Sequence, residues 1–427
     1  MKLSASKNSQ PLLVVVLIGV YLFFTVPNFL TSLYAEDGQV YLQDAFNTGG
    51  LNNLFKTVAG YGDLPARAIA AFVSPFPLIL YPYLYGVCTV LVMSVCVRVV
   101  YSSVEEVLEN RILAFYFSIF LVIMPIARFE SIGNVTNLHF FFFTASTFVF
   151  IQFALLRTSS VGKLLFVFAA ALSVPLSIFH FIFVFFRWRE NLQFLRDPKR
   201  FLSTPFFFLL VGTVLNFAIS WGDSSTRTPT NSNSILKILY LYLDRVVGSA
   251  FVPFWGRVSS QGYETVFSHS LFESAYLRAI ISILILGTLL VCTTRLKRKL
   301  RAMAFFLLFA SILYSFLIGF FYNLEPRYCI FPSYVTAFLL FLYLDSTKTK
   351  WLRVYVAIFL LLLALNANSE SESRKNAPDW AVQVNTASKT CEADPVIKDV
   401  SIRTAPFRSN SQWFLVVPCN RLSSFSD

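Results

Sequence analysis

The sequence is poor in charged residues, which make up only 14% of its 427 positions. A soluble chain of ordinary composition carries about 25% charged residues. Apolar residues account for 56%, and Phe alone occurs 48 times. Several apolar stretches approach the ~20 residues that a helix needs to cross a bilayer core. The composition therefore excludes an ordinary soluble protein and predicts an all-α polytopic membrane protein with about 9–11 transmembrane or re-entrant helices.

Several familiar motifs are also missing from the chain. It has no internal repeat, no soluble nucleotide-binding fingerprint and no residue spacing that marks a dedicated metal site. A water-soluble nucleotide is therefore not an expected substrate. The formal net charge of +12 could indicate a nucleic-acid partner. However, Lys and Arg gather in short segments at 187–200, 295–301 and 348–353, which is the pattern of cytoplasmic loops, so no nucleic-acid partner is expected.

The first apolar stretch, Pro11–Leu33, is too long for the core of a signal peptide and is predicted to be a retained first span. Lys2 and Lys7 keep the N-terminus inside, so the span delivers residues 35–77 to the outside as a long external loop. This loop is expected to contain interfacial helices, because apolar residues recur at helical spacing with polar ones opposite. The apolar residues are Leu51, Leu54, Phe55 and Val58, and the polar ones are Asn52, Asn53, Lys56 and Thr57.

Eight further spans are predicted near residues 78–100, 112–126, 138–156, 204–221, 276–294, 304–321, 332–346 and 352–366. Residues 164–186 allow two interpretations. A single crossing would put the basic segment 187–200 outside, against the positive-inside rule. Two short helices that meet near Pro175 would keep both flanks inside. We therefore favour a hairpin.

Counting crossings in this way brings polar residues from distant parts of the chain to one external face. The acidic pair Glu36-Asp37 follows the first span directly, and Arg327-Tyr328 begins a later span. The loop between these spans, at 127–139, supplies four candidate substrate-binding residues, namely Glu130, Asn134, Asn137 and His139. This shared external face is the main sequence clue to function.

Residues 367–427 differ from the rest, because charges of both signs balance and apolar runs such as Gln412–Val417 indicate strands. They are predicted to form a small periplasmic or extracellular tail after a transmembrane domain at 1–366. Cys391 and Cys419 both lie in this tail, where an oxidising compartment favours a disulfide between them. Two unrelated thiols are the alternative.

The external polar residues suit the transfer of a group from a lipid phosphate to a hydroxyl. The planar fork of Arg327 suits the phosphate, and Tyr328 lies beside it in the chain. A carboxylate at the same surface can act as general base on the acceptor hydroxyl. We favour Asp37 as this base because Gly38 lets the backbone bend, with Glu36 orienting the base, the acceptor or a metal. On position alone, the pair could instead be a solvated spacer.

Three other residues keep two interpretations each. His139 is either a satisfied interfacial histidine or a ligand. Asp63 and Arg67 form either a local pair at a helix start or part of the rim of a substrate cavity. A metal is an open question as well: Mg²⁺ or Mn²⁺ bridging Glu36, Asp37 and the donor phosphate would suit hard oxygen ligands.

The stretch EDGQVYLQDAF, which places Glu36-Asp37 after the first span, resembles the opening of GT-C-fold glycosyltransferases. Arg327-Tyr328 is similar to the Arg-Tyr near a later external span end in aminoarabinose transferases and protein O-mannosyltransferases of that fold. Together with GYGDLPARAIA, NVTNLHFFF and the two-cysteine tail, the stretch is also similar to a group of uncharacterised bacterial membrane proteins. The resemblance implies a GT-C-like fold, a polyprenyl-phosphate sugar as donor and a site on the external face of a bacterial inner membrane.

The predicted function is therefore transfer of a hexosyl or pentosyl group from a polyprenyl phosphate to a hydroxyl of a glycan or lipid acceptor. Surface glycan or lipopolysaccharide modification is the expected setting. A transporter or flippase of lipid-linked glycan is the main alternative, although transporters usually place charges near the membrane midplane rather than at one face. A third possibility is a non-catalytic assembly factor that uses the tail as a docking module.

Overall fold

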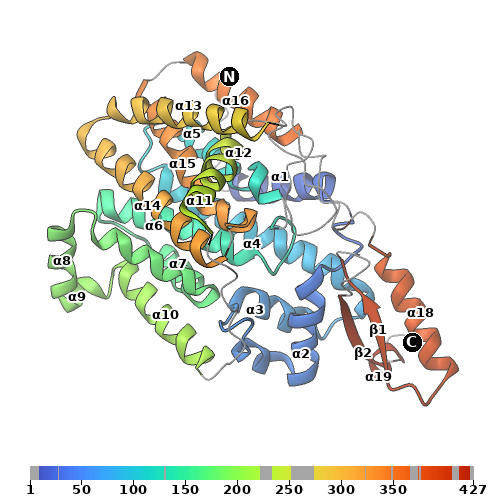
Figure 1. The fold of residues 1–427 in the computed structure, drawn as a ribbon. Coiled ribbons are helices and arrows are strands. Elements are labelled where there is room, and N and C mark those ends of the chain that lie inside the picture. The colour runs from blue at the N-terminus through green and yellow to red at the C-terminus, as the bar shows by residue number, and fades with distance from the viewer. Residues whose placement is uncertain are drawn as a thin grey trace.

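The described residues of the computed structural model form a mostly helical body with a small two-stranded sheet at one end (Figure 1). Five of the described helices are long and apolar enough to cross a membrane, as expected of an integral membrane protein. The structure describes residues 9–26, 28–128, 131–221, 233–251, 274–322, 324–347, 350–365, 374, 377–405 and 413–423.

The helical body follows most of the predicted spans. Helix α6 has the predicted bounds, and α10, α13 and α16 begin and end within two residues of the predicted ones. The main helices of the body are α1 (Ser9–Thr25), α4 (Tyr81–Val104), α5 (Arg111–Ile123), α6 (Leu138–Leu156), α7 (Val161–Ser173), α10 (Pro205–Ser220), α13 (Ala275–Thr294), α14 (Arg298–Tyr322), α15 (Pro326–Thr347) and α16 (Lys350–Leu365).

Three predicted boundaries are wrong by six residues or more, and one of them is the start of α14, which lies at Arg298 rather than near 304. The first span was expected to reach Leu33, but α1 ends at Thr25. Pro27 follows soon after and disfavours helical backbone in the residue before it, and Asn28 has a left-handed φ of 52°. Helix α15 begins at Pro326 rather than near 332, because its first turns are formed by the polar residues that come before the apolar run.

Helix α6 lies at the centre of the body, and its residues from Leu138 to Leu155 are all buried. It packs against α4, α7 and α15. Aromatic rings fill much of this core: Phe117 of α5 stacks on Tyr334 of α15 with ring centroids 4.3 Å apart. The Tyr334 hydroxyl donates to the Phe117 carbonyl at 2.6 Å, so the ring is buried without leaving its polar atom unsatisfied.

The segment 164–186 forms the hairpin that we favoured. Helix α7 ends at Ser173, and a 3₁₀ helix, η5 (Pro175–Val184), carries the chain back. The two flanks of the segment meet in space, because Arg157 Nη2 contacts Glu190 Oε2 at 3.1 Å. Pro175 lacks a backbone N–H and cannot continue the hydrogen bonding of α7, which explains the break at that residue.

The loop after α1 is folded into short helices. These are a π-helix η1 (Asp37–Leu42), α2 (Gln43–Thr48), a 3₁₀ helix η2 (Gly50–Phe55) and α3 (Leu64–Val73). Leu51 and Phe55 are exposed. Asn53 was expected on the exposed polar face but is fully buried, because its amide donates to the Arg67 carbonyl and accepts from the Arg67 guanidinium.

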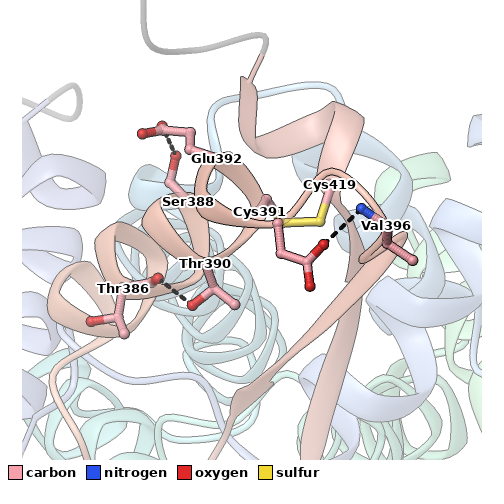
Figure 2. The surroundings of a disulfide bond; sticks show 8 residues. Thr386, Ser388, Thr390, Cys391, Glu392, Val396 and Cys419 are labelled. Carbon is pink, nitrogen blue, oxygen red and sulfur yellow. Dashed lines mark hydrogen bonds between the residues drawn. A yellow bond between two sulfur atoms is a disulfide. The ribbon is translucent and has the colours of Figure 1, made fainter.

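The tail forms a compact unit closed by the disulfide between Cys391 and Cys419, whose Cα atoms are 5.6 Å apart (Figure 2). One cysteine lies near the end of a helix and the other follows the second strand directly. The two strands pair antiparallel. The elements are α18 (Trp380–Ala393), β1 (Asp399–Arg403), β2 (Phe414–Pro418) and α19 (Cys419–Ser423).

The tail packs directly on the loop after α1. The Ala405 amide donates to the Leu33 carbonyl at 2.8 Å. The Trp380 amide donates to the Thr31 carbonyl at 3.0 Å, and its indole N–H donates to the Leu78 carbonyl at 2.7 Å. In Figure 1 the sheet accordingly lies beside α2, and α18 lies on the other side of the sheet. The first loop and the tail, far apart in sequence, therefore share one packed region.

Candidate functional site

A cavity of about 250 Å³ lies where α6 begins, and we call this the outer end of the body. Four distant segments supply its walls: the loop after α1, the loop before α6, the break between α7 and η5, and the start of α15. The lining residues are Glu36, Ala59, Gly60, Tyr61, Thr136, Asn137, His139, Phe140, Val174, Pro175, Leu176, Arg327 and Tyr328. The cavity thus brings together three of the segments that the sequence predicted to share a face.

The two members of the acidic pair take different positions. Glu36 is half-buried and lines the cavity. Asp37 is only 2% exposed, and its carboxylate accepts from the Val135 amide at 3.3 Å. It also accepts from the amide and the hydroxyl of Thr136, at 2.8 and 2.7 Å. Asp37 therefore holds the loop before α6, and Thr136 lies between it and the cavity.

The pKa of the Asp37 carboxyl is raised from 3.8 to about 6. Burial is the largest cause, because it disfavours the charged form. The bonds from Thr136 and the positive charge of Arg374 work in the opposite direction, while the neighbouring charge of Glu36 raises the pKa further. A carboxyl with such a pKa is mostly ionised at neutral pH yet close to the range in which proton transfer is efficient.

Gly38 is needed for a different reason from the one that the sequence indicated. We expected it to let the backbone bend so that Asp37 faces a cavity. In the structure, a Cβ at Gly38 would lie 2.6 Å from Cγ2 of Thr404 in the tail. Glycine is therefore required by the close approach of the tail to the first loop.

Arg327 and Tyr328 line the cavity from the start of α15. The Arg327 guanidinium pairs with Glu325 and is 16% exposed on its side chain. It lies over the Tyr328 ring at 5.5 Å from the centroid, and that ring packs edge-on against Phe140. These contacts hold a planar cation at the wall of the cavity.

His139 also lines the cavity and is held from behind by Asp63. Its Nδ1 lies 3.2 Å from Asp63 Oδ2, and the Tyr41 hydroxyl donates to the same oxygen at 2.9 Å. Burial, followed by the charge of Asp63, raises the pKa of Tyr41 well above its usual value, so this tyrosine stays a donor. The imidazole is thus fixed in orientation, with Tyr61 packed edge-on against it.

The Arg67 side chain binds other residues of the loop after α1 and does not line the cavity. Its guanidinium pairs with Asp44 at 2.8 Å and donates to Asn53 and to the Thr57 carbonyl. The contact with Asp63 at the start of α3 is a backbone one, from the Arg67 amide to the Asp63 carbonyl at 3.0 Å. The two residues proposed as a pair therefore have separate side-chain partners.

The other predicted substrate-binding residues, from the loop before α6, take different positions. Asn137 lines the cavity. Asn134 is buried and accepts from the guanidinium of Arg374 at 2.6 Å. Glu130 lies outside the described residues.

Two residues near the acidic pair were not predicted. Thr136 lies within the NVTNLH stretch that carried the resemblance, so its position was a usable signal. Arg374 lies in a polar run at the start of the tail and is only 3% exposed. Nothing in its sequence surroundings distinguishes it from a solvated arginine, and only the fold brings it to the loop before α6.

The described residues at the cavity do not fit a resident divalent cation. Mg²⁺ and Mn²⁺ need several oxygen ligands. Glu36 is the one carboxylate among the lining residues that the structure describes, and the oxygens of Asp37 are occupied by Val135 and Thr136. Within the described ranges, no group of three or more His, Cys, Asp or Glu side chains gathers as a metal site would require.

No protein-family model matches the chain, and no curated protein sequence matches it either. The chemistry of the cavity therefore has to carry the functional argument together with the short sequence motifs.

Proposed function

We propose that the protein is a membrane glycosyltransferase of GT-C type that moves a sugar from a polyprenyl phosphate to a hydroxyl acceptor at the external face. The acceptor would be a glycan or lipid of a bacterial cell envelope. The observation that carries the proposal is that one cavity is lined by both Glu36 and Arg327, which lie far apart in the sequence. A base and a phosphate-binding cation are the two parts that this transfer needs.

The reaction divides between these two residues. The Glu36 carboxylate takes the proton of the acceptor hydroxyl, and the oxygen so activated forms a bond to the anomeric carbon of the sugar. The bond from that carbon to the phosphate oxygen breaks, and the phosphate leaves with the electron pair. The Arg327 guanidinium stabilises the negative charge that builds up on the leaving phosphate through paired hydrogen bonds.

The proposal assigns the base to Glu36, whereas the sequence favoured Asp37. Glu36 lines the cavity, and Asp37 is turned to the loop at Thr136. Asp37 then has the task of fixing that loop and, through the adjacent peptide, the direction of Glu36. If Asp37→Asn lowered transfer more than Glu36→Gln, the base would be Asp37 as first predicted.

The rest of the lining suits a sugar joined to a lipid. Polar groups of Thr136, Asn137 and His139 can bind sugar hydroxyls. Aromatic rings at Tyr61 and Phe140 offer faces for packing against the sugar ring. The break at Pro175 adds apolar side chains of the kind that would contact the first lipid units, namely Val174 and Leu176.

The test uses the full-length protein in liposomes with a panel of synthetic polyprenyl-phosphate sugars. The wild type should release polyprenyl phosphate only when a hydroxyl acceptor is present. Arg327→Ala should weaken donor binding about 10- to 100-fold, because a hydrogen-bonded charge contact contributes roughly 1.5–3 kcal/mol. The matched control is Arg157→Ala, which removes a partly buried arginine at the other end of α6 and should leave donor binding unchanged.

The same liposomes separate the transporter alternative. Movement of lipid-linked sugar across the bilayer without release of polyprenyl phosphate would contradict the enzyme and support a flippase. Failure of every donor in the panel to react, with protein folded and inserted, would also count against the proposal.

A further inference from the structure

The buried guanidinium of Arg374 links the tail to the loop that precedes α6. Its Nη1 donates to the Ser32 carbonyl at 2.9 Å. Its Nη2 donates to the Gly133 carbonyl at 2.9 Å and to Asn134 Oδ1 at 2.6 Å. The side chain also lies over the Tyr34 ring, 5.5 Å from the centroid. One tail residue thus joins the exit of α1 to the loop whose next residues line the cavity.

Arg374 and Asp37 hold consecutive parts of the same short loop. Arg374 binds residues 133 and 134, and the Asp37 carboxylate binds residues 135 and 136. Only glycine fits well at the first residue of this loop, because Gly133 has a φ of +79° and a Cβ there would lie 3.2 Å from Val26. Moving either charged group would therefore displace the segment that continues into the cavity wall.

The two charges also depend on each other. Arg374 and Asp37 are 3% and 2% exposed, so each is a charge removed from water. Burial lowers the pKa of Arg374, and the negative charge of Asp37 opposes that effect. Glu36 is the other acidic group near Asp37, and Tyr85 of α4 donates to the Asp37 carbonyl oxygen. Removing one of two compensating buried charges leaves the other uncompensated, which is costly.

We propose that Arg374 is a positioning residue for the acidic pair: it locks the loop 133–136 against Asp37 so that Glu36 is presented to the cavity. The tail is then a structural part of the active centre. The catalytic consequence rests on the proposed function, whereas the coupling between the two charges does not.

The test is a double-mutant cycle in the full-length purified protein, measured by thermal unfolding without any sugar substrate. Arg374→Gln should lower the midpoint, because it leaves the Asp37 carboxylate buried without its compensating charge. The double variant should lose clearly less than Arg374→Gln and Asp37→Asn predict when added, because removing both charges leaves none uncompensated. The control cycle mutates Arg421 instead of Arg374. Arg421 is another tail arginine, and it donates to the Ser74 carbonyl and lies over the Phe46 ring. Arg421→Gln and Asp37→Asn should be additive.

Transfer kinetics supply the second readout. Arg374→Gln should lower kcat about 10- to 100-fold with the KM for donor within about twofold, because a misplaced base costs rate rather than binding. Arg374→Lys should recover part of the rate. If Arg374→Gln fails to accumulate, the double variant with Asp37→Asn should restore its abundance.

The inference would be overturned if the midpoint changes of Arg374→Gln and Asp37→Asn added up as those of the control cycle do. It would also be overturned if the double variant failed to restore abundance. If the coupling is present but the wild type transfers no sugar from any donor, the proposed function fails while the positioning contact remains. If the wild type transfers sugar and Arg374→Gln behaves as Arg421→Gln does, only the positioning role fails.

Discussion

Two buried polar clusters lie at the two ends of α6, and their hydrogen bonding differs. At the inner end, where α6 ends, Lys163 Nζ donates to the Ser102 carbonyl at 2.8 Å and to Gln152 Oε1 at 2.7 Å. It also contacts Glu106 Oε1 at 3.3 Å. An ammonium group has three protons to donate, so this lysine is fully satisfied by its neighbours.

At the outer end, one buried carboxylate retains an unused acceptor. Asp63 accepts two hydrogen bonds at Oδ2, while its Oδ1 has no hydrogen-bond partner within the described part of the chain. Glu36 and Arg327 both line the cavity. The comparison of the two ends of α6 shows that a charged residue at the end of a span is not by itself a sign of function. Convergence of distant segments around a cavity is what separates a site from a structural ion pair.

The largest expected effect compares one glutamate from each end. Glu36→Gln should lower the transfer rate about 10²- to 10⁴-fold at matched membrane abundance, because a positioned base is lost. Glu106→Gln removes a partner of Lys163 at the inner end and should leave the rate within about twofold. Transfer assays on both variants check this. Equal losses would mean that the two clusters do not differ in function.

The disulfide should affect stability more than chemistry. Replacing Cys391 and Cys419 with Ser removes a cross-link between residues separated by 28 in sequence and should destabilise the tail by roughly 2–4 kcal/mol. The measurements are abundance and thermal midpoint, with Cys292→Ser, a free and half-exposed thiol, as control. Transfer per folded molecule should fall less than abundance. Detection of two free thiols in protein purified without reductant would contradict this account.

The smallest effect is the pH dependence of stability from Asp37. Because its pKa in the folded protein is about 6, above the ordinary 3.8, the folded state holds the proton more tightly than the unfolded chain. Protonation therefore stabilises the fold: this contribution is complete below about pH 4 and is lost as the pH rises through 6, with a slope of at most about 1.4 kcal/mol per pH unit. Asp37→Asn should lack it. Identical pH profiles of unfolding for wild type and variant would show that Asp37 does not titrate in this window.

Local composition was enough to predict most of the helical body, because a span depends on its own run of apolar residues. It was also enough for the Cys391–Cys419 pairing and the break at Pro175. The site was only partly predictable. Glu36 and Arg327 were found because both adjoin predicted spans, whereas Arg374 approaches them through tertiary packing of the tail. The direction of Asp37, toward Thr136, likewise depends on a contact across 99 residues of sequence.

The central claim is that the cavity at the outer end transfers sugar, and the most direct test is analysis of surface glycans and lipid-linked sugars in a deletion strain. The strain should lose a sugar modification and accumulate flipped but untransferred lipid-linked sugar. The wild-type gene should reverse both changes, and Glu36→Gln at equal abundance should reverse neither. Full restoration by Glu36→Gln, or loss of flipping itself in the deletion strain, would contradict the account.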